Sequence, residues 1–184
     1  VGIACQKVSE PEIFAQAGFN DIQIPYNIVG ESKTRKLVDL ATYNRVNVSA
    51  DHISVIAGLA DAAKAMDINV RVLVDLGTHI QRTGAKAHEM VTLAQRIEKE
   101  EQLHFAGLMV YPSDVKARPV IQEALSSLDR AGIGVDVVSG GGFGASFEAS
   151  QIPELTEIRV GTYVFGDWRS VQRQWTTLEH CAMR

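Results

Sequence analysis

Short apolar runs alternate with longer amphipathic segments along the chain. The runs are rich in Val, Ile and Leu, which is typical of strands buried on both faces. They predict seven strands, at residues 1–5, 21–25, 46–49, 69–75, 105–110, 134–138 and 157–160. The intervening segments carry apolar residues at helical spacing and predict helices at residues 11–17, 32–42, 53–66, 87–100, 119–131 and 168–180.

The regular alternation of strand and helix predicts parallel βα units joined by right-handed crossovers. Such units form either an open doubly wound sheet or a barrel. A closed barrel of this kind needs eight strands, one more than the pattern provides. Because the chain has 184 residues and no linker or low-complexity segment, we expect one α/β domain over residues 1–184.

Composition and charge narrow the range of partners. The net charge of −4 gives no basic surface for nucleic acid, and no apolar run is long enough to cross a membrane. The two cysteines, Cys5 and Cys181, suggest no disulfide framework, and no signal-peptide pattern is present, so we expect a cytoplasmic protein. The five histidines show no metal-ligand spacing, and we assign no metal site to this chain.

The strongest chemical signal is a glycine-rich loop after the sixth predicted strand. A β-branched run ends there in Ser139, Gly140, Gly141 and Gly142. Glycine lets a ligand approach the backbone closely, and successive N–H groups suit an anion, usually a phosphate. The alternative is a tight turn that binds nothing, and three consecutive glycines favour the anion site.

A second loop and three side chains are expected at the same end of the sheet, because ligands of parallel βα folds lie at the carboxyl ends of the strands. The residues after the seventh strand give another loop suited to an anion, Gly161-Thr162-Tyr163. Two cations and an aromatic hydroxyl lie nearby in the same pattern, namely Arg82, Arg159 and Tyr111. The alternative for Arg82 is a surface cation, for Arg159 half of a structural ion pair, and for Tyr111 a ring in the core. Together they would suit a planar phosphorylated ligand.

Several segments, in order, resemble the D-threonine aldolase and D-serine dehydratase family of pyridoxal-phosphate enzymes. The segments are Ile3-Ala4-Cys5, Asp75-Leu76-Gly77 with Arg82-Thr83-Gly84, Gly107-Leu108 with Tyr111, Ser139-Gly140-Gly141-Gly142, and Arg159-Val160-Gly161-Thr162-Tyr163. The match extends over nearly the whole chain. It implies an α/β TIM-type barrel of the alanine-racemase N-terminal kind that lacks its first strand.

The resemblance also implies a role for each candidate residue. Arg82 would lie near the cofactor's 3-hydroxyl group, and Tyr111 would lie against or beside its ring. Arg159 would face the pyridine nitrogen and leave it unprotonated, because an arginine does not give up its proton. The cofactor phosphate would lie between the two loops, at Ser139, Gly140, Gly141, Gly142, Gly161, Thr162 and Tyr163.

The chain departs from the family pattern in its spacing and at its ends. The segment between Gly77 and Arg82 is longer than the family's. The family's Schiff-base lysine ends a strand that would precede Val1, and Lys7 follows a different strand, so we assign no catalytic residue. The family's C-terminal β domain, which carries its divalent metal, would follow Arg184. We therefore expect a partial barrel whose open edges need a partner, a rearrangement or the missing segments, and we expect a homo-oligomer.

The leading functional hypothesis is the barrel portion of a pyridoxal-phosphate-dependent lyase. By the resemblance, the enzyme would take a small D-amino acid and cleave or dehydrate D-3-hydroxy amino acids, and this chain would be inactive alone. One alternative is a non-catalytic module that binds pyridoxal phosphate. Another is an unrelated phosphate-binding barrel, such as a sugar-phosphate isomerase. The sequence does not separate an aldolase from a dehydratase or a racemase.

Overall fold

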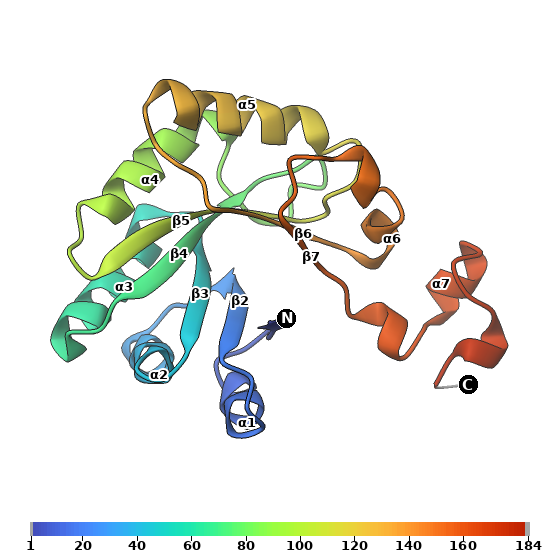
Figure 1. Ribbon diagram of the computed structural model, residues 1–184, viewed down its shortest axis with the longest axis horizontal. Helices are drawn as coiled ribbons and strands as arrows, with labels where there is room; N and C mark the ends of the chain where they lie inside the picture. The colour runs from blue at the N-terminus through green and yellow to red at the C-terminus, as the bar shows by residue number, and fades with distance from the viewer. Residues whose placement is uncertain (1, 183–184) are drawn as a thin grey trace.

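The computed structural model describes residues 2–182 and contains one curved sheet of seven parallel strands (Figure 1). The strands follow chain order across the sheet, and each pairs with its neighbours in sequence. Among the described residues β1 and β7 do not pair, so the barrel is open between them. The strands are β1 (Ile3–Ala4), β2 (Asp21–Asn27), β3 (Arg45–Ala50), β4 (Val70–Leu76), β5 (Leu103–Val110), β6 (Val137–Gly141) and β7 (Glu157–Arg159).

Helices connect the successive strands and cover the outer face of the sheet (Figure 1). Pro11 and Pro119 lie in the first turns of their helices, where the missing proline N–H breaks no helical hydrogen bond. The helices are α1 (Pro11–Gln16), α2 (Glu31–Ala41), α3 (Ile53–Met66), α4 (Met90–Glu98), α5 (Arg118–Arg130), α6 (Phe143–Ser146) and α7 (Trp168–Gln172). Single 3-10 turns are η1 (Ala87–Glu89), η2 (Ala149–Gln151), η3 (Thr162–Val164) and η4 (Leu178–His180). The predicted seven-strand α/β barrel architecture is confirmed.

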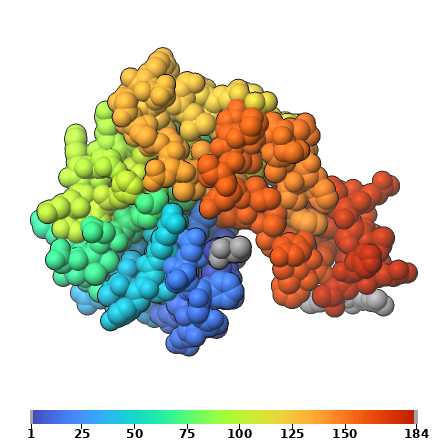
Figure 2. Space-filling model, in the orientation of Figure 1, coloured from blue at the N-terminus to red at the C-terminus, as the bar shows by residue number. Residues whose placement is uncertain are grey.

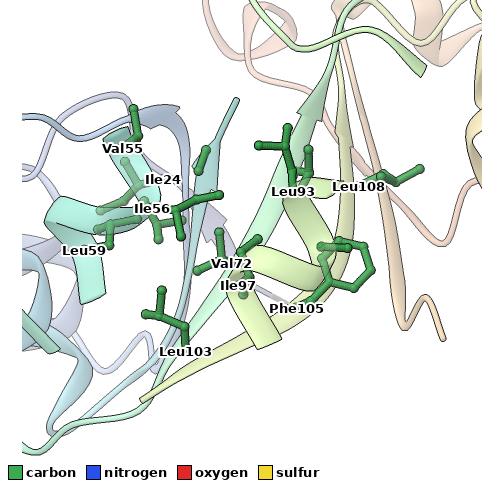
Figure 3. Packing of buried hydrophobic residues seen from close by; sticks show 14 of the residues in the cluster. Ile24, Val55, Ile56, Leu59, Val72, Leu93, Ile97, Leu103, Phe105 and Leu108 are labelled. Atoms are coloured by element: carbon green, nitrogen blue, oxygen red, sulfur yellow. The ribbon is translucent and has the colours of Figure 1, made fainter. Parts of the chain in front are cut away.

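Alternate strand residues divide the buried side chains into two groups. Outward-facing positions such as Val72 and Leu108 pack with the apolar stripes of α3 and α4 (Figure 3). Inward-facing residues form a separate, small cluster of Leu73, Ala106, Met109 and Val137. Because the larger group lies between the sheet and the helices, most of the hydrophobic stabilisation comes from the outer face of the sheet.

The inner face of the sheet is partly polar. Asp75 lies two residues after Leu73, and Ser139 lies two residues after Val137, so both point into the barrel with those apolar side chains. Gln23 on β2 is buried as well, and the exposed fractions of Gln23, Asp75 and Ser139 are 6%, 4% and 0%. Buried polar groups need hydrogen-bond partners, and the Ser139 hydroxyl has Gln23, Glu157 and Arg159 within reach.

The helix predicted at residues 168–180 is wrong beyond its first turns. Asp167 caps α7 by accepting a hydrogen bond from the Ser170 N–H at 2.6 Å, but the helix ends at Gln172. Gln174 then takes a left-handed backbone conformation with φ of 59°. Trp175 leaves the helical stripe and packs on two rings of the α6 region, Phe143 and Phe147, with centroids 5.7 and 5.9 Å away. The tertiary aromatic contact therefore overrides the local helical pattern.

The C-terminal segment lies apart from the N-terminal strands. Figure 2 shows a hollow between them, on the side where the barrel is open. Trp168 and Leu178, expected on a packed stripe, have exposed fractions of 64% and 50%. These two side chains therefore lie outside the barrel's main core.

Two further features bear on the chain's environment and its thiols. No helix within residues 2–182 combines the length and the apolar character that a membrane crossing requires.

Cys5 and Cys181 are both free and buried. Burial, with a smaller contribution from Glu10, raises the pKa of Cys5 to about 11, so its thiol is protonated near neutral pH and is a weak nucleophile.

A glycine in β5 gives a test of this architecture. Gly107 has a φ of 139°, and a Cβ there would collide with the carbonyl oxygen of Val137 on β6. We expect Gly107→Ala to lower the free energy of unfolding by about 2–4 kcal/mol, measured by urea denaturation.

The matched control is Gly58→Ala in α3, where an added Cβ meets no atom within 4 Å. Alanine is the better helix former, so we expect this variant to gain about 0.5–1 kcal/mol. Equal stability of the two variants would contradict the close approach of β5 and β6.

Candidate functional site

A cavity of ≈ 230 Å³ opens at the carboxyl ends of the strands. Four of the predicted site residues meet there, namely Arg82, Tyr111, Gly141 and Arg159. The rest of the lining comes from the ends of β1, β2 and β5, with Ala4, Cys5, Gln6, Pro25, Tyr26 and Met109. A larger groove of ≈ 770 Å³ between α2 and α3 contains none of the predicted residues and lies on the outer face of the barrel. The strand-end cavity is therefore the candidate site.

Arg82 reaches the cavity because its loop folds back onto β4. The Gly77 N–H donates to the Ala85 carbonyl at 2.8 Å, and the Ala85 N–H donates to the Asp75 carbonyl at 2.9 Å. The long spacing between Gly77 and Arg82 is thus taken up by a closed loop, and the guanidinium still arrives at the strand ends.

Two tyrosine rings hold the Arg82 guanidinium. Its central carbon lies 4.1 Å from the ring centroid of Tyr111 and 5.8 Å from that of Tyr26. A cation over an aromatic face gains about 0.5–2 kcal/mol, depending on exposure. Tyr111 is itself fixed by Thr78, whose hydroxyl donates to the Tyr111 carbonyl at 2.9 Å. Cation and ring, predicted separately, therefore form one unit at the cavity.

The Arg159 side chain extends from β7 into the barrel and lines the same cavity as Arg82 and Tyr111. Its guanidinium donates to the Val110 carbonyl at 3.1 Å and to the hydroxyl of Ser139. Burial lowers the pKa of Arg159 to about 10, while the carboxylates of Glu157 and Asp75 act in the opposite direction. The side chain therefore stays positively charged near neutral pH, with its hydrogen bonds made inside the barrel.

The Ser139 hydroxyl lies among these groups rather than in the loop. It is fully buried and lies 2.5 Å from Glu157 Oε1 and 3.1 Å from Gln23 Oε1, in addition to its contact with Arg159. A hydroxyl has one proton, so it can donate to only one of these two acceptors at a time. Gln23 Nε2 is buried without a hydrogen-bond partner among the described residues. The predicted phosphate contact of Ser139 stays a prediction.

The three glycines after Ser139 face different neighbours. A Cβ on Gly140 would lie 2.5 Å from the Ser113 hydroxyl, and a Cβ on Gly141 would lie 2.8 Å from Arg159 Nη2. The Gly141 N–H donates to Ser113 Oγ at 3.0 Å, so this amide already has a partner. Gly142, with a φ of 111°, begins α6. The close approaches explain glycine at 140 and 141, and the positive φ explains it at 142.

The second loop follows the next strand but does not line the cavity. Gly141 pairs with Arg159, so the segments after them leave neighbouring strands at the same level of the sheet. Gly161 precedes the turn η3, and Gly161, Thr162 and Tyr163 are all exposed. A phosphate shared between the two loops stays a prediction for these three residues.

The sequence reasoning gave no role to Asp75, although it quoted the residue in a motif. Asp75 is 4% exposed at the end of β4. Burial raises its pKa to about 6, with Asp51 acting in the same direction and the Thr83 hydrogen bond, Arg159 and Arg82 opposing it. An acidic residue in a strand that is otherwise apolar apart from Arg71 was the available signal. Tyr26 was likewise noted only as a strand-end residue. No metal-binding group of three or more His, Cys, Asp or Glu residues occurs within residues 2–182.

The raised pKa of Asp75 predicts how stability depends on pH. The folded state holds the proton more tightly than the unfolded state, whose Asp pKa is near 3.8. Stability from this group is therefore full below about pH 4 and is lost as the pH rises through about 6, at a cost of about 3 kcal/mol. We expect Asp75→Asn to be more stable than wild type at about pH 7.5, with a gain that nearly vanishes at about pH 4 in urea denaturation.

Asp136 provides the control for this experiment. It lies at the opposite end of the barrel, and hydrogen bonding to Arg71 lowers its pKa. Asp136→Asn should therefore lose stability at neutral pH rather than gain it. A gain for Asp75→Asn that is equal at both pH values would contradict the assigned pKa.

Comparison with known proteins places the chain in a family. Residues 1–168 match the model of the alanine racemase N-terminal domain. A D-threonine aldolase of Arthrobacter sp. is 30% identical over 190 residues, covering 95% of this chain and 50% of the relative. A 3-hydroxy-D-aspartate aldolase of Paracoccus denitrificans (strain Pd 1222) is 30% identical over 183 residues, covering 91% and 47%. The chain thus spans about half the length of the curated relatives that it matches.

Solved structures agree with this result. The D-threonine aldolase from Filomicrobium marinum superposes with a TM-score of 0.82 at 29% identity, covering 91% of this chain and 49% of that one. The D-threo-3-hydroxyaspartate dehydratase from Delftia sp. HT23 gives a TM-score of 0.87 at 20% identity, over 99% and 52%, and supports the fold alone. With residues 1–168 matched and the barrel topology in agreement, the chain belongs to the alanine racemase N-terminal domain family.

Proposed function

We propose that this chain is the cofactor-binding barrel portion of a pyridoxal-phosphate-dependent lyase. Its substrates would be D-3-hydroxy amino acids, cleaved by a retro-aldol reaction or dehydrated. The two curated relatives described above are aldolases of this substrate type by name, and the Delftia protein is a dehydratase. The observation that carries the proposal is the meeting of Arg82, Tyr111, Gly141 and Arg159 at one cavity.

The cavity lining supports a flat anionic ligand through its charge and its aromatic ring. Arg82 and Arg159 provide two cations, and Tyr111 provides a ring. A Cβ on Gly141 would come within 2.8 Å of Arg159 Nη2 and 3.2 Å of Tyr111 Cδ2. Glycine at 141 therefore lets both side chains line the cavity against the backbone.

Each residue then has a binding role in the proposal. Arg159 would face the pyridine nitrogen and, with its pKa of about 10, would donate a hydrogen bond without giving up its proton. Arg82 would lie near the cofactor's 3-hydroxyl group, and Tyr111 would lie against or beside its ring. The loops at 140–142 and 161–163 would bind the phosphate. When bound, the cofactor withdraws electrons from the substrate's reacting carbon, which both retro-aldol cleavage and dehydration require.

A second candidate function is a module that binds pyridoxal phosphate without catalysis. One observation favours it, because the residues that line the cavity in the described part of the chain include no lysine. Lys7 belongs to the turn after β1, where its ammonium group is mostly exposed and lies 3.8 Å from Glu10. Covalent attachment of the cofactor distinguishes the lyase from the module.

We also propose that the chain works in the cytoplasm as part of a homo-oligomer. Two free cysteines support a reducing compartment. Tyr163, Phe165 and Trp168 have exposed fractions above 60%, which supports a covering partner on the C-terminal segment.

Binding of pyridoxal phosphate tests the proposal. We expect the chain to bind it in a titration followed by absorbance, and inorganic phosphate to compete. Gly141→Ala should weaken binding by about ten-fold, because the added methyl group crowds Arg159 and Tyr111. The matched control is Gly134→Ala, where an added Cβ meets no atom within 4 Å, and its affinity should equal that of wild type.

Two outcomes would count against the cofactor site. One is equal affinity of both glycine variants, and the other is binding that inorganic phosphate does not reduce. Borohydride treatment followed by mass spectrometry tests whether a lysine of this chain attaches the cofactor. Reduction that fixes the cofactor on one specific lysine would exclude the module, whereas full release on denaturation agrees with the module and with a lyase whose Schiff-base lysine lies outside residues 1–184.

A further inference from the structure

Four residues on neighbouring strands lie in register with one another, next to the cavity. Asp75 on β4 pairs with Met109 on β5, Met109 pairs with Ser139 on β6, and Ser139 pairs with Glu157 on β7. These four residues therefore lie side by side across four strands. The hydroxyl of Ser139 contacts the Arg159 guanidinium at this level. Asp75 thus lies under the cavity that Arg159 lines.

The Asp75 carboxyl is enclosed by groups from several elements. Thr83, in the loop that carries Arg82, hydrogen-bonds to it. The charges that act on it are Asp51 at the end of β3, Arg82 in the loop after β4 and Arg159 on β7. Glu157 on β7 and Tyr26 on β2 act electrostatically on Arg159. Tyr111 after β5 and Cys5 after β1 line the same cavity. The buried Asp75 carboxyl therefore lies within the electrostatic influence of two cations and one further acid.

Among the described residues, the Asp51 carboxylate accepts hydrogen bonds from Asn27 and from the loop backbone rather than from an arginine. It accepts from the Asn27 side chain at 2.7 Å and from the Gly84 N–H at 3.1 Å. Glu157 contacts the Ser139 hydroxyl. The Asp75 carboxyl accepts a hydrogen bond from Thr83, and its charge acts on Asp51, which opposes its ionisation, and on Arg159 and Arg82, which favour it.

We propose that Asp75 is a positioning residue that sets the positive charge available to an anion in the strand-end cavity. Ionised Asp75 offsets part of the charge of Arg82 and Arg159. Protonated or amidated, it leaves both cations to the bound anion. The inference rests on the proposed function in its choice of pyridoxal phosphate as ligand, whereas the charge argument applies to any anion in the cavity.

The test compares the dissociation constant of pyridoxal phosphate for wild type and Asp75→Asn at two pH values. The ratio of the two constants at one pH cancels the titration of the ligand's own phosphate. At about pH 7.5, where Asp75 is ionised, the variant should bind about five- to ten-fold more tightly than wild type, as expected for removing a unit charge several ångströms away. At about pH 5, where wild-type Asp75 is mostly protonated, the ratio should fall below about two-fold.

Asp136→Asn is the control, because it removes one carboxylate at the far end of the strands. Its ratio to wild type should stay near one at both pH values. A merely structural effect of Asp75→Asn would change affinity equally at both pH values, and that result, or a ratio of one throughout, would overturn the proposal.

Failure of the cofactor proposal is distinguishable from failure of this one. If wild type does not bind pyridoxal phosphate, the proposed function fails. The same ratios are then measured with sulfate, a dianion throughout this pH range, from its protection against thermal unfolding. A pH-dependent ratio with sulfate supports the role of Asp75, and a flat ratio overturns it.

Discussion

The partly buried guanidinium of Arg159 is the constraint on which the site depends. A charge taken out of water needs hydrogen bonds and counter-charges from its surroundings. The Val110 carbonyl and the Ser139 hydroxyl provide the hydrogen bonds, and Glu157 and Asp75 provide negative charge. The polar inner face of the barrel at this level follows from that requirement. Leucine or valine at 139 would remove the only one of these two hydrogen-bond acceptors that a side chain provides.

The same guanidinium also explains the glycine pattern. Its Nη2 atom would lie only 2.8 Å from a Cβ on Gly141, and the Tyr111 ring would lie 3.2 Å from it. Ser113 closes the other side by binding the Gly141 backbone through both its own N–H and its hydroxyl. Ser113, after β5, therefore hydrogen-bonds to the loop, and the Arg159 side chain of β7 packs against it. Its glycines serve close packing as much as any anion, which joins the two interpretations that the sequence left open.

Much of the fold could be predicted from the sequence because strand and helix patterns here agree with the tertiary structure. Arg82, Tyr111, Gly141 and Arg159 were predictable as neighbours because parallel strands bring their carboxyl ends together. The inward position of the Ser139 hydroxyl depends on strand phase, which one residue of slip would reverse. Asp75 escaped notice because its environment comes from three other segments. The helix expected to reach residue 180 failed because Trp175 finds rings on another element.

The division between the two faces of the sheet makes a charged interior possible. The outer cluster, which includes Val72, Ile97 and Leu108, carries the hydrophobic stabilisation (Figure 3). The inner apolar cluster is small, so polar residues at the open end displace little packing. An ionised Asp75 costs about 3 kcal/mol at neutral pH, a sum that a marginal core would not tolerate. Asp75 therefore lowers the stability of the barrel near neutral pH, while its charge acts on the two cations that line the cavity.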